Sequence, residues 1–263
     1  MSKKQLVKKS KKEQKKVANQ YDNDNYNYRQ YWRGRDYENA AETMAIKRFL
    51  RGKKFKRAAD IGGGYGRLCV LLEKYADKVV LAEPSKAQLD IARDFLKNHK
   101  NIDRQLMQAD DLKFDDGSLD LVTMIRVMHH LPDPTKELSE IHRVLAEDGY
   151  FVLELANYAH ARNRLKYLLK RKPLPKNPVD IRSKQNKREE EIAFVNHNPK
   201  TVIAQLDKTG FKVEKILSVS NLRSPGLKKI LPRPIMLSAE RILQSPFSRI
   251  YFGPSVFFLL KKK

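Results

Sequence analysis

Short apolar runs alternate with helix-like patterns along most of this chain, from residue 57 onward. Such alternation is typical of repeated β–α–β units, which form a parallel sheet covered by helices. The pattern predicts seven strands, at residues 57–61, 78–82, 103–107, 119–125, 149–155, 211–220 and 251–260.

Start and stop signals mark the helices between these strands. Ser85 with Gln88 three residues later forms a capping box. Asp133 and Asn198 each precede a proline, which places a cap before a proline at the first helical position. Gly210 ends the helix expected at 199–209. These signals agree with the strand spacing, and a further helix is expected at 36–51.

Two segments are longer than ordinary connections. Residues 157–197 are rich in Lys, Arg and Pro, which predicts a functional cap or a partly disordered loop. Residues 221–248 combine several prolines with an apolar pattern and predict a short helical excursion. We therefore expect a basic disordered tail at 1–20 and one domain at 21–263, with its core at 36–156 and 198–263, a cap insertion at 157–197 and a second insertion at 221–248.

The charge of the chain bears on its partners. The formal net charge is +23 and the pI is near 9.9, so nucleic acid, anionic lipid and acidic small molecules would all be attracted. Much of the excess lies in the lysine-rich tail and at 162–188. The tail is expected to be a solubilising extension, with an electrostatic contact as the alternative.

Several classes of protein are disfavoured. The single cysteine, Cys69, excludes an internal disulfide framework and a multi-cysteine metal site, so we expect it in the core and expect no metal. The longest apolar run, 255–260, is too short to span a bilayer. No apolar stretch follows the first lysines as it would in a signal peptide. We therefore expect a cytoplasmic protein.

The most informative stretch, DIGGGYG, begins at Asp60, where a predicted strand passes into a predicted helix. Glycines allow a sharp turn and a close approach to a ligand, and the start of a helix offers unpaired N–H groups. Glycines stand at Gly62, Gly64 and Gly66. The dinucleotide fingerprint would also require a glycine at Arg67, so the spacing disfavours NAD.

Glu83 ends the second predicted strand, about twenty residues after the loop, where a carboxylate can accept both hydroxyls of a ribose. Helix capping is the alternative role. Ribose binding is favoured because the loop, the strand end and the acid agree with one topology.

These residues lie within a run, 60–155, that resembles the class I S-adenosylmethionine-dependent methyltransferases, in particular the type 11 group that includes quinone-biosynthesis C-methyltransferases. The matching stretches are ADIGGGYGR, VVLAEPS, QADDLKFDDGSLDLV, MHHLPDP and EIHRVLAEDGYFVLE. The resemblance extends to 199–211 but omits the tail and most of both insertions. It implies a doubly wound, Rossmann-like α/β fold whose seven-stranded sheet is mostly parallel with the last strand antiparallel, supplemented by the basic cap insertion.

The resemblance also implies how the cofactor, S-adenosylmethionine, is held. The cofactor-binding residues would be Asp60, Gly62, Gly63, Gly64 and Gly66 for the amino-acid end, Glu83 for the ribose with Pro84 beside it, and Gln108, Ala109 and Asp110 for the adenine. Either Gln108 or Asp110 matches the position that contacts the adenine amine in relatives, and Asp110 is favoured.

Three further residues are candidates for the chemistry. Arg126 stands where relatives carry an apolar or small residue, which implies contact with an acidic acceptor or with the cofactor carboxylate. Either His129 or His130 could serve as a general base near the transferred methyl group. The favoured alternative is that both close the strand and cap the next helix, because methyl transfer from a sulfonium can proceed by positioning and desolvation alone.

Two motifs of known methyltransferases are missing, and their absence narrows the classes of methyl acceptor. Residues 125–128 replace the Asn/Asp-Pro-Pro-Tyr/Phe sequence used for amino-nitrogen methylation, and Cys69 is misplaced for pyrimidine methylation. We therefore expect a small-molecule or lipid-like acceptor and only non-specific contact with nucleic acid, and the positive charge leaves an anionic acceptor as one option. The alternatives are an RNA methyltransferase, supported by charge, and a basic binding protein that kept the fold and lost turnover.

The start of the cap insertion, 162–171, has helical spacing that places Leu165, Leu168 and Leu169 on one side with cations around them. This pattern predicts either peripheral contact with an anionic membrane or a helix packed on the core with a solvated basic face. The second interpretation is slightly favoured, and the oligomeric state is left open.

Overall fold

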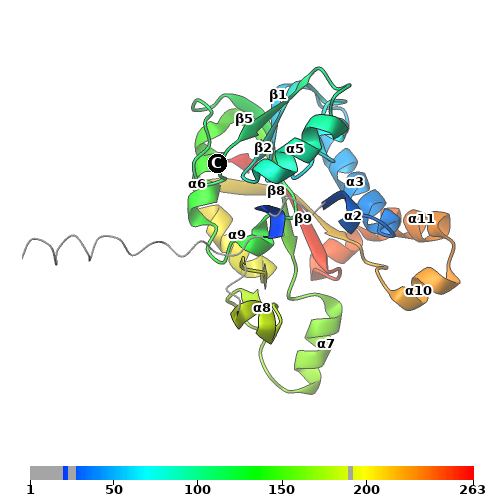
Figure 1. Cartoon of the computed structure of the whole chain (residues 1–263). Helices are drawn as coiled ribbons and strands as arrows, with labels where there is room; N and C mark the ends of the chain where they lie inside the picture. The colour runs from blue at the N-terminus through cyan, green and yellow to red at the C-terminus, as the bar shows by residue number, and fades with distance from the viewer. Residues whose placement is uncertain (1–19, 23–27, 189–191) are drawn as a thin grey trace, which may run out of the picture.

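The structure is a computed structural model that describes residues 20–22, 28–188 and 192–263 (Figure 1). The basic tail expected at 1–20 therefore lies outside the described residues, apart from residue 20.

One seven-stranded sheet forms the centre of the domain, with the order β3-β2-β1-β4-β5-β9-β8. Strands β1 to β5 pair in parallel, whereas β9 runs antiparallel to both of its neighbours, β5 and β8. This confirms the doubly wound sheet with an antiparallel last strand. The strand bounds are Phe55–Ile61 (β1), Ala76–Glu83 (β2), Ile102–Leu106 (β3), Leu119–Met124 (β4), Leu145–Ala156 (β5), Phe211–Val219 (β8) and Ser255–Lys262 (β9).

Helices cover both faces of the sheet and bury two apolar clusters. One cluster includes Phe49 and Leu72, and the other includes Leu138 and Leu206. Cys69 is fully buried in the first cluster, as expected. The helices concerned are α3 (Asp36–Leu50), α4 (Cys69–Leu72), α5 (Lys86–Phe95), α6 (Thr135–Val144) and α9 (Pro199–Lys208).

Local capping follows the expected signals with one difference. The Ser85 side chain accepts the Gln88 N–H at the start of α5, and Asn198 caps α9 in the same way. Helix α6 begins one residue later than expected, because Pro134 is itself the cap residue. Asp133 still contributes there by accepting the Thr135 N–H at 3.2 Å.

The last strand begins at Ser255, so the expected start at residue 251 was wrong. Tyr251 has a left-handed backbone, with φ of 47°, and follows the turn η3 (Pro246–Ile250). A strand requires extended backbone, so it can form only after this residue.

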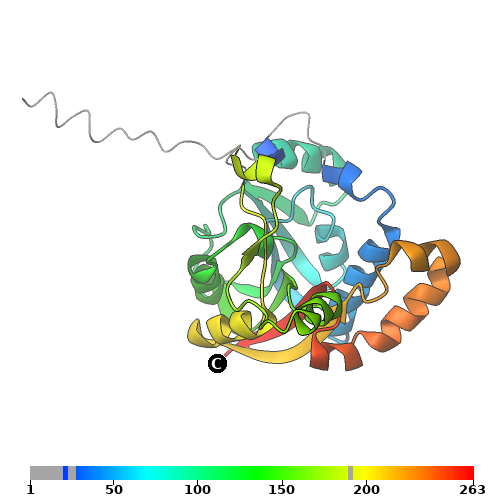
Figure 2. The same ribbon diagram turned by 90° about the horizontal axis from the view of Figure 1, so that it is seen from below.

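Both insertions are ordered in their described parts. The cap insertion forms α7 (Ala161–Leu169), α8 (Lys184–Arg188) and an unexpected two-stranded ribbon of β6 (Val179–Asp180) and β7 (Val195–Asn196). The second insertion forms α10 (Pro225–Ile230) and α11 (Arg233–Leu243), the helical excursion that was expected. Figure 2 shows α10 and α11 along one side of the molecule. No helix among the described residues is long and apolar enough to cross a bilayer.

Candidate active site

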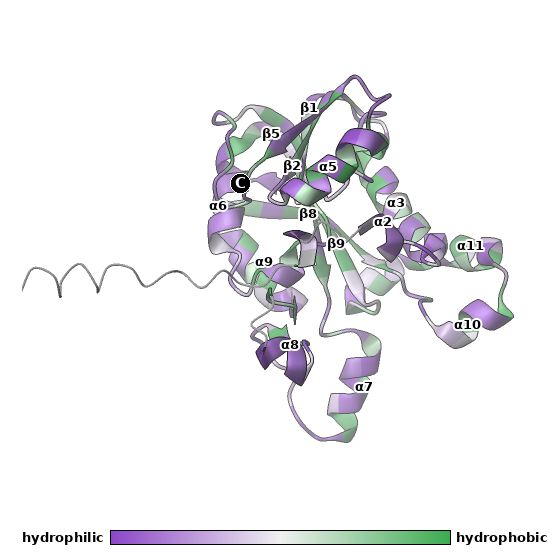
Figure 3. Ribbon diagram, viewed as in Figure 1, coloured by the Kyte–Doolittle hydropathy of each residue, from purple (hydrophilic) through white to green (hydrophobic). Residues whose placement is uncertain are grey.

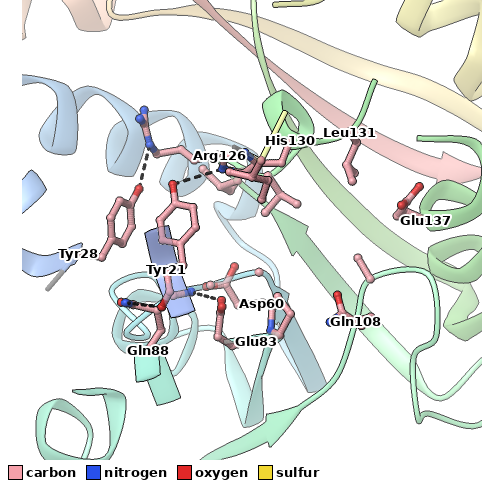
Figure 4. A pocket seen from close by; sticks show the side chains of 18 of the residues that line it. Tyr21, Tyr28, Asp60, Glu83, Gln88, Gln108, Arg126, His130, Leu131 and Glu137 are labelled. Carbon is pink, nitrogen blue, oxygen red and sulfur yellow. Dashed lines mark hydrogen bonds between the residues drawn. The ribbon is translucent and has the colours of Figure 1, made fainter. Parts of the chain in front are cut away.

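A cavity of about 340 Å³ lies where the carboxyl ends of β1, β2 and β4 meet. Expected site residues that line it are Asp60, Gly62, Gly63, Gly64, Glu83, Pro84, Gln108, Ala109, Asp110, Arg126 and His130 (Figure 4). Of the expected residues, Gly66 and His129 do not line this cavity. The structure therefore brings together residues that are far apart in the sequence, at the edge of the sheet where doubly wound folds bind ligands.

The glycine loop packs tightly beneath this cavity. A Cβ atom on Gly63 would lie 2.4 Å from Asp60 Oδ2 and 2.6 Å from Leu81 Cδ1, so only glycine fits. Gly66 has φ of 83° and packs against Leu96, which explains why it is needed although it does not line the cavity. The loop is thus fixed by close packing before any ligand binds.

Glu83 joins the glycine loop to the start of α5. Its carboxylate accepts the Gly64 N–H at 2.8 Å and the Ser85 N–H at 3.0 Å. Burial raises the pKa of Glu83 to about 7, and these two hydrogen bonds lower it only in part. A nearly buried carboxylate at the cavity wall retains lone pairs for further donors, such as hydroxyl groups.

Asp60, the next-to-last residue of β1, lines the cavity and is 1% exposed. Its Oδ1 atom accepts the Thr123 hydroxyl of β4 at 2.6 Å. Burial raises the pKa of Asp60 to about 6, against the opposing effect of that hydrogen bond. The side chain is therefore held in one orientation between two strands.

The cavity wall expected to contact adenine includes Glu137, which was not expected from the sequence. Gln108 and Asp110 both line the cavity, so both alternatives for the adenine contact stay open. Glu137 of α6 also lines it, and its buried Oε2 atom has no hydrogen-bond partner among the described residues. A buried acceptor without a donor is costly, so this atom is suited to a ligand N–H. Its position in the first turn of a helix gave no signal of this role.

The described N-terminal residues form another wall that was not expected. Tyr21, in the short turn η1 (Gln20–Asp22), accepts the Ser85 hydroxyl with its backbone oxygen at 2.6 Å. Its ring lies 5.7 Å from that of Tyr28 and 5.4 Å from that of His130. Figure 4 shows the Tyr21 ring extending from beside Gln88 toward His130, with the Tyr28 ring next to it. The tyrosine-rich stretch carried no periodic pattern from which this contact could be predicted.

Arg126 follows β4 with a left-handed backbone, φ 64°, which is uncommon for a residue other than glycine. Its guanidinium donates to Tyr28 Oη at 3.2 Å, to Tyr31 Oη at 2.5 Å and to Glu42 Oε1 at 3.5 Å. Tyr28 and Tyr31 belong to α2 (Tyr28–Tyr31), which therefore tethers the Arg126 side chain. The unusual backbone is held by a dense set of contacts, as expected of strain at a functional site.

A second cavity of about 270 Å³ shares Arg126 with the first. Its walls come from the N-terminal helices, from β5 and from both insertions. They include the aromatic residues Tyr31, Trp32 and Phe194, the cations Arg35, Arg126 and Arg223, the carboxylates Glu38, Glu42 and Glu154, and both His129 and His160. The cap insertion therefore helps to enclose a cavity next to the glycine loop.

His129 and His130 line different cavities. His129 is 5% exposed and lines the second cavity, and burial lowers its pKa well below the usual value. His130 lines the first, where Nδ1 lies 2.8 Å from the Ala193 carbonyl oxygen and Nε2 lies 3.3 Å from Tyr21 Oη. Burial also lowers the pKa of His130. A neutral ring that donates from Nδ1 leaves Nε2 as a proton acceptor.

Most of the chain matches a known protein family. The family described as "Methyltransferase domain" matches residues 31–216, and the chain belongs to this family. Its relatives are methyltransferases, and the structural neighbours include S-adenosylmethionine-dependent methyltransferases, so S-adenosylmethionine is the cofactor that the family implies.

Individual relatives match only the centre of the chain. The uncharacterized methyltransferase YcgJ of Bacillus subtilis is 32% identical over 99 residues, which cover 37% of this chain and 39% of YcgJ. Demethylmenaquinone methyltransferase of Clavibacter sepedonicus is 32% identical over 98 residues, covering 37% and 40%. The chain thus spans about two fifths of these relatives. The crystal structure of a methyltransferase from Thermotoga maritima shares the fold, with a TM-score of 0.62 at 19% identity, over 90% of this chain and 95% of that one.

Proposed function

We propose that this protein transfers a methyl group from S-adenosylmethionine to a small or lipid-like acceptor bound in the second cavity. The observation that carries the proposal is that Arg126 lines both cavities, so a donor in one and an acceptor in the other would be neighbours. Proximity and orientation of this kind supply much of the rate enhancement that a displacement reaction needs.

The first cavity fits the cofactor in size and in polar groups. Its volume of about 340 Å³ falls within the range of small-molecule sites. Glu83 would accept the ribose hydroxyls, and Asp60 with the glycine loop would hold the amino-acid end. The unpaired Glu137 Oε2 would accept the adenine amine, in addition to Gln108 or Asp110. When bound, the cofactor supplies an electrophilic methyl group on a sulfonium.

The second cavity favours an acceptor with a flat apolar body and an acidic group. Trp32 and Phe194 provide apolar walls. Arg126 and Arg223 already lie 3.5 Å from the carboxylates of Glu42 and Glu38, respectively. Arg35 instead stacks over the Tyr31 ring at 4.0 Å and has no carboxylate within 4.0 Å among the described residues. Its guanidinium is therefore available to an acidic group of the acceptor.

His130 would take a proton from an acceptor nucleophile that reaches from the second cavity into the first. It lines the first cavity, next to Arg126 and Val127, and burial lowers the pKa of its ring, which favours the unprotonated form. This role would apply to acceptors that carry a hydroxyl or amine proton, since general-base catalysis requires an unprotonated imidazole.

Labelling with methyl-labelled S-adenosylmethionine tests the proposal. Cell extract would be separated into polar metabolites, lipids and RNA, and each fraction incubated with the protein. We expect the label in one acidic small molecule or lipid. Sequence-dependent methylation of RNA would overturn this acceptor class, and no transfer to any fraction would favour a binding protein without turnover.

A pair of matched variants tests the role of Arg35 once an acceptor is found. Arg35→Gln should lower kcat/KM for the acceptor about tenfold or more, the usual effect of losing one charge-assisted hydrogen bond, without changing cofactor affinity. Arg33→Gln, an exposed residue of the same segment, serves as the control. Equal kinetics for the two variants would contradict the assignment of Arg35.

A further inference from the structure

The two insertions expose apolar side chains that the fold does not use. Nine large apolar residues are exposed among the described residues, and six of them lie on α7, α10 and α11. On α7 the exposed fractions are 58% for Leu165, 73% for Leu168 and 77% for Leu169. We call these three residues the α7 surface. Helix α7 therefore does not pack its leucines on the core, contrary to the interpretation favoured from the sequence.

The second set lies on the other insertion. Ile230 of α10 is 77% exposed, and Ile235 and Ile242 of α11 are 55% and 72% exposed. We call these the α10–α11 surface. Figure 3 shows α7 and α10 extending away from the sheet, each with hydrophobic and hydrophilic residues along its length. Apolar groups in such positions typically mark an interaction site.

Positive charge surrounds both surfaces. Between residues 161 and 178 there is no acidic residue, and the cations are Arg162, Arg164, Lys166, Lys170, Arg171, Lys172 and Lys176. Next to the isoleucines of the α10–α11 surface the sequence places the cations Lys229, Arg233 and Arg241, of which Arg233 also pairs with Asp36 at 3.2 Å. Leucine and isoleucine flanked by cations are the combination that binds the interface of an anionic bilayer.

Both surfaces are close in sequence to residues that line the second cavity. His160, the cap residue of α7, lines this cavity, and so does Arg223, two residues before α10 begins. In Figure 1, α7 extends below the sheet, and α10 and α11 extend to the right of it. A bilayer that contacts both helices would therefore lie close to the cavity assigned to the acceptor.

We propose that the α7 surface and the α10–α11 surface dock this protein on anionic membrane. Nucleic acid would use the cations but would not need exposed leucines and isoleucines. A second copy of the chain would bring like-charged helices together, which is unfavourable. This proposal rests on the proposed function in one respect: docking would bring a lipid-like acceptor to the second cavity. Membrane binding itself is measured without cofactor or acceptor.

Vesicle co-sedimentation of the full chain tests the proposal. The probes are phosphatidylcholine vesicles with and without phosphatidylglycerol, at low and high salt. We expect binding only to the anionic vesicles, with weaker binding at high salt. The lysines before residue 20 also attract anionic vesicles, so binding of the unmodified chain alone does not decide the matter, and variants are required.

The leucine variant is decisive because it leaves every charge in place. Leu168→Gln with Leu169→Gln should weaken binding to anionic vesicles about tenfold or more, since two side chains lose their burial in the interface. Leu106→Gln is the matched control, because Leu106 is 60% exposed but lies on the edge strand β3. It should bind as the unmodified chain does.

A charge variant measures the electrostatic part. Replacing Arg162, Lys166 and Lys170 together by Gln should weaken binding about 100-fold, because each cation near an anionic surface contributes about 1 kcal/mol. The control replaces three exposed lysines elsewhere, Lys47, Lys97 and Lys100. Both variants should retain the thermal stability of the unmodified chain, because the replaced side chains are exposed.

Four outcomes would overturn the proposal. They are equal binding to neutral vesicles, no binding to anionic vesicles, loss of binding in the charge variant with none in the leucine variant, and a dimer in light scattering that the leucine variant converts to monomer. The third outcome would indicate electrostatic binding of the kind that nucleic acid also supports. None of these outcomes depends on methyl transfer, so failure of docking is distinguishable from failure of the proposed function.

Discussion

Replacing Glu83 by Gln is the sharpest test of the cofactor site. The substitution preserves the shape of the side chain but exchanges one acceptor oxygen for an NH2 donor. Glu83 now accepts N–H groups from Gly64 at 2.8 Å and Ser85 at 3.0 Å, and it lines the first cavity. The variant therefore loses both the charge that would hold the ribose and one of these two internal hydrogen bonds.

The two losses have separate magnitudes. Hydrogen bonds to a charged group are each worth about 1.5–3 kcal/mol, so the dissociation constant for S-adenosylhomocysteine should rise about 10- to 150-fold. One buried N–H left without an acceptor costs about 1–3 kcal/mol of folding free energy. The variant should therefore bind more weakly and also melt at a lower temperature.

Glu240→Gln is the matched control. Glu240 is also buried and accepts N–H groups from Ser220 at 2.8 Å and Asn221 at 3.0 Å, but it does not line the cofactor cavity. It should lose stability without losing cofactor affinity. Titration calorimetry, at a temperature where both variants are folded by circular dichroism, gives the comparison. If Glu83→Gln binds as tightly as the unmodified chain, the ribose assignment is refuted.

Two further predictions concern pH and the glycine loop. Because burial raises the pKa of Glu83 to about 7, affinity for S-adenosylhomocysteine should rise with pH and level off above about 7, and calorimetry of Glu83→Gln should show a flatter profile. Glu83 also stabilises the cofactor-free fold at acidic pH. This contribution is lost as the pH rises from the ordinary pKa of a glutamate through about 7, and thermal melts at different pH values would detect the loss. Gly63→Ala should abolish cofactor binding and cost about 1–3 kcal/mol of stability, because the new Cβ would meet Asp60 and Leu81. Gly226→Ala, whose nearest contact would be at 3.7 Å, should leave cofactor binding unchanged, and equal loss in both variants would contradict the packing argument.

The parts of the site that sequence could predict are those that depend on local spacing. Asp60 and Glu83 each lie at the carboxyl end of a strand, and parallel strands bring these ends together at one edge of a sheet. The position of each residue along its own strand therefore predicted its place in the cavity. The order of the sheet and its antiparallel strand came from the family resemblance.

The remaining parts depend on contacts between distant segments. Tyr21 reaches Ser85 across a sequence separation of 64, and no spacing rule links the two residues. Glu137 has the same sequence features as any acid in the first turn of a helix. Nothing in the sequence marks Arg126 for a left-handed backbone, because Gly or Asn would be expected there. The second cavity is formed by the N-terminal helices together with both insertions. Local sequence patterns do not specify how these distant segments pack against one another.

The inner position of β9 has a consequence for synthesis of the chain. The hydrogen-bonding edge of β5 is completed only by β9, for example where Phe151 pairs with Leu260. On a ribosome, the roughly 100 residues between these strands take about 5–20 s to produce. During that interval the nascent sheet presents an open, apolar strand edge, which is the kind of surface that pairs with other chains. Production of this protein should therefore depend more on chaperone capacity during translation than its compact sheet alone would indicate.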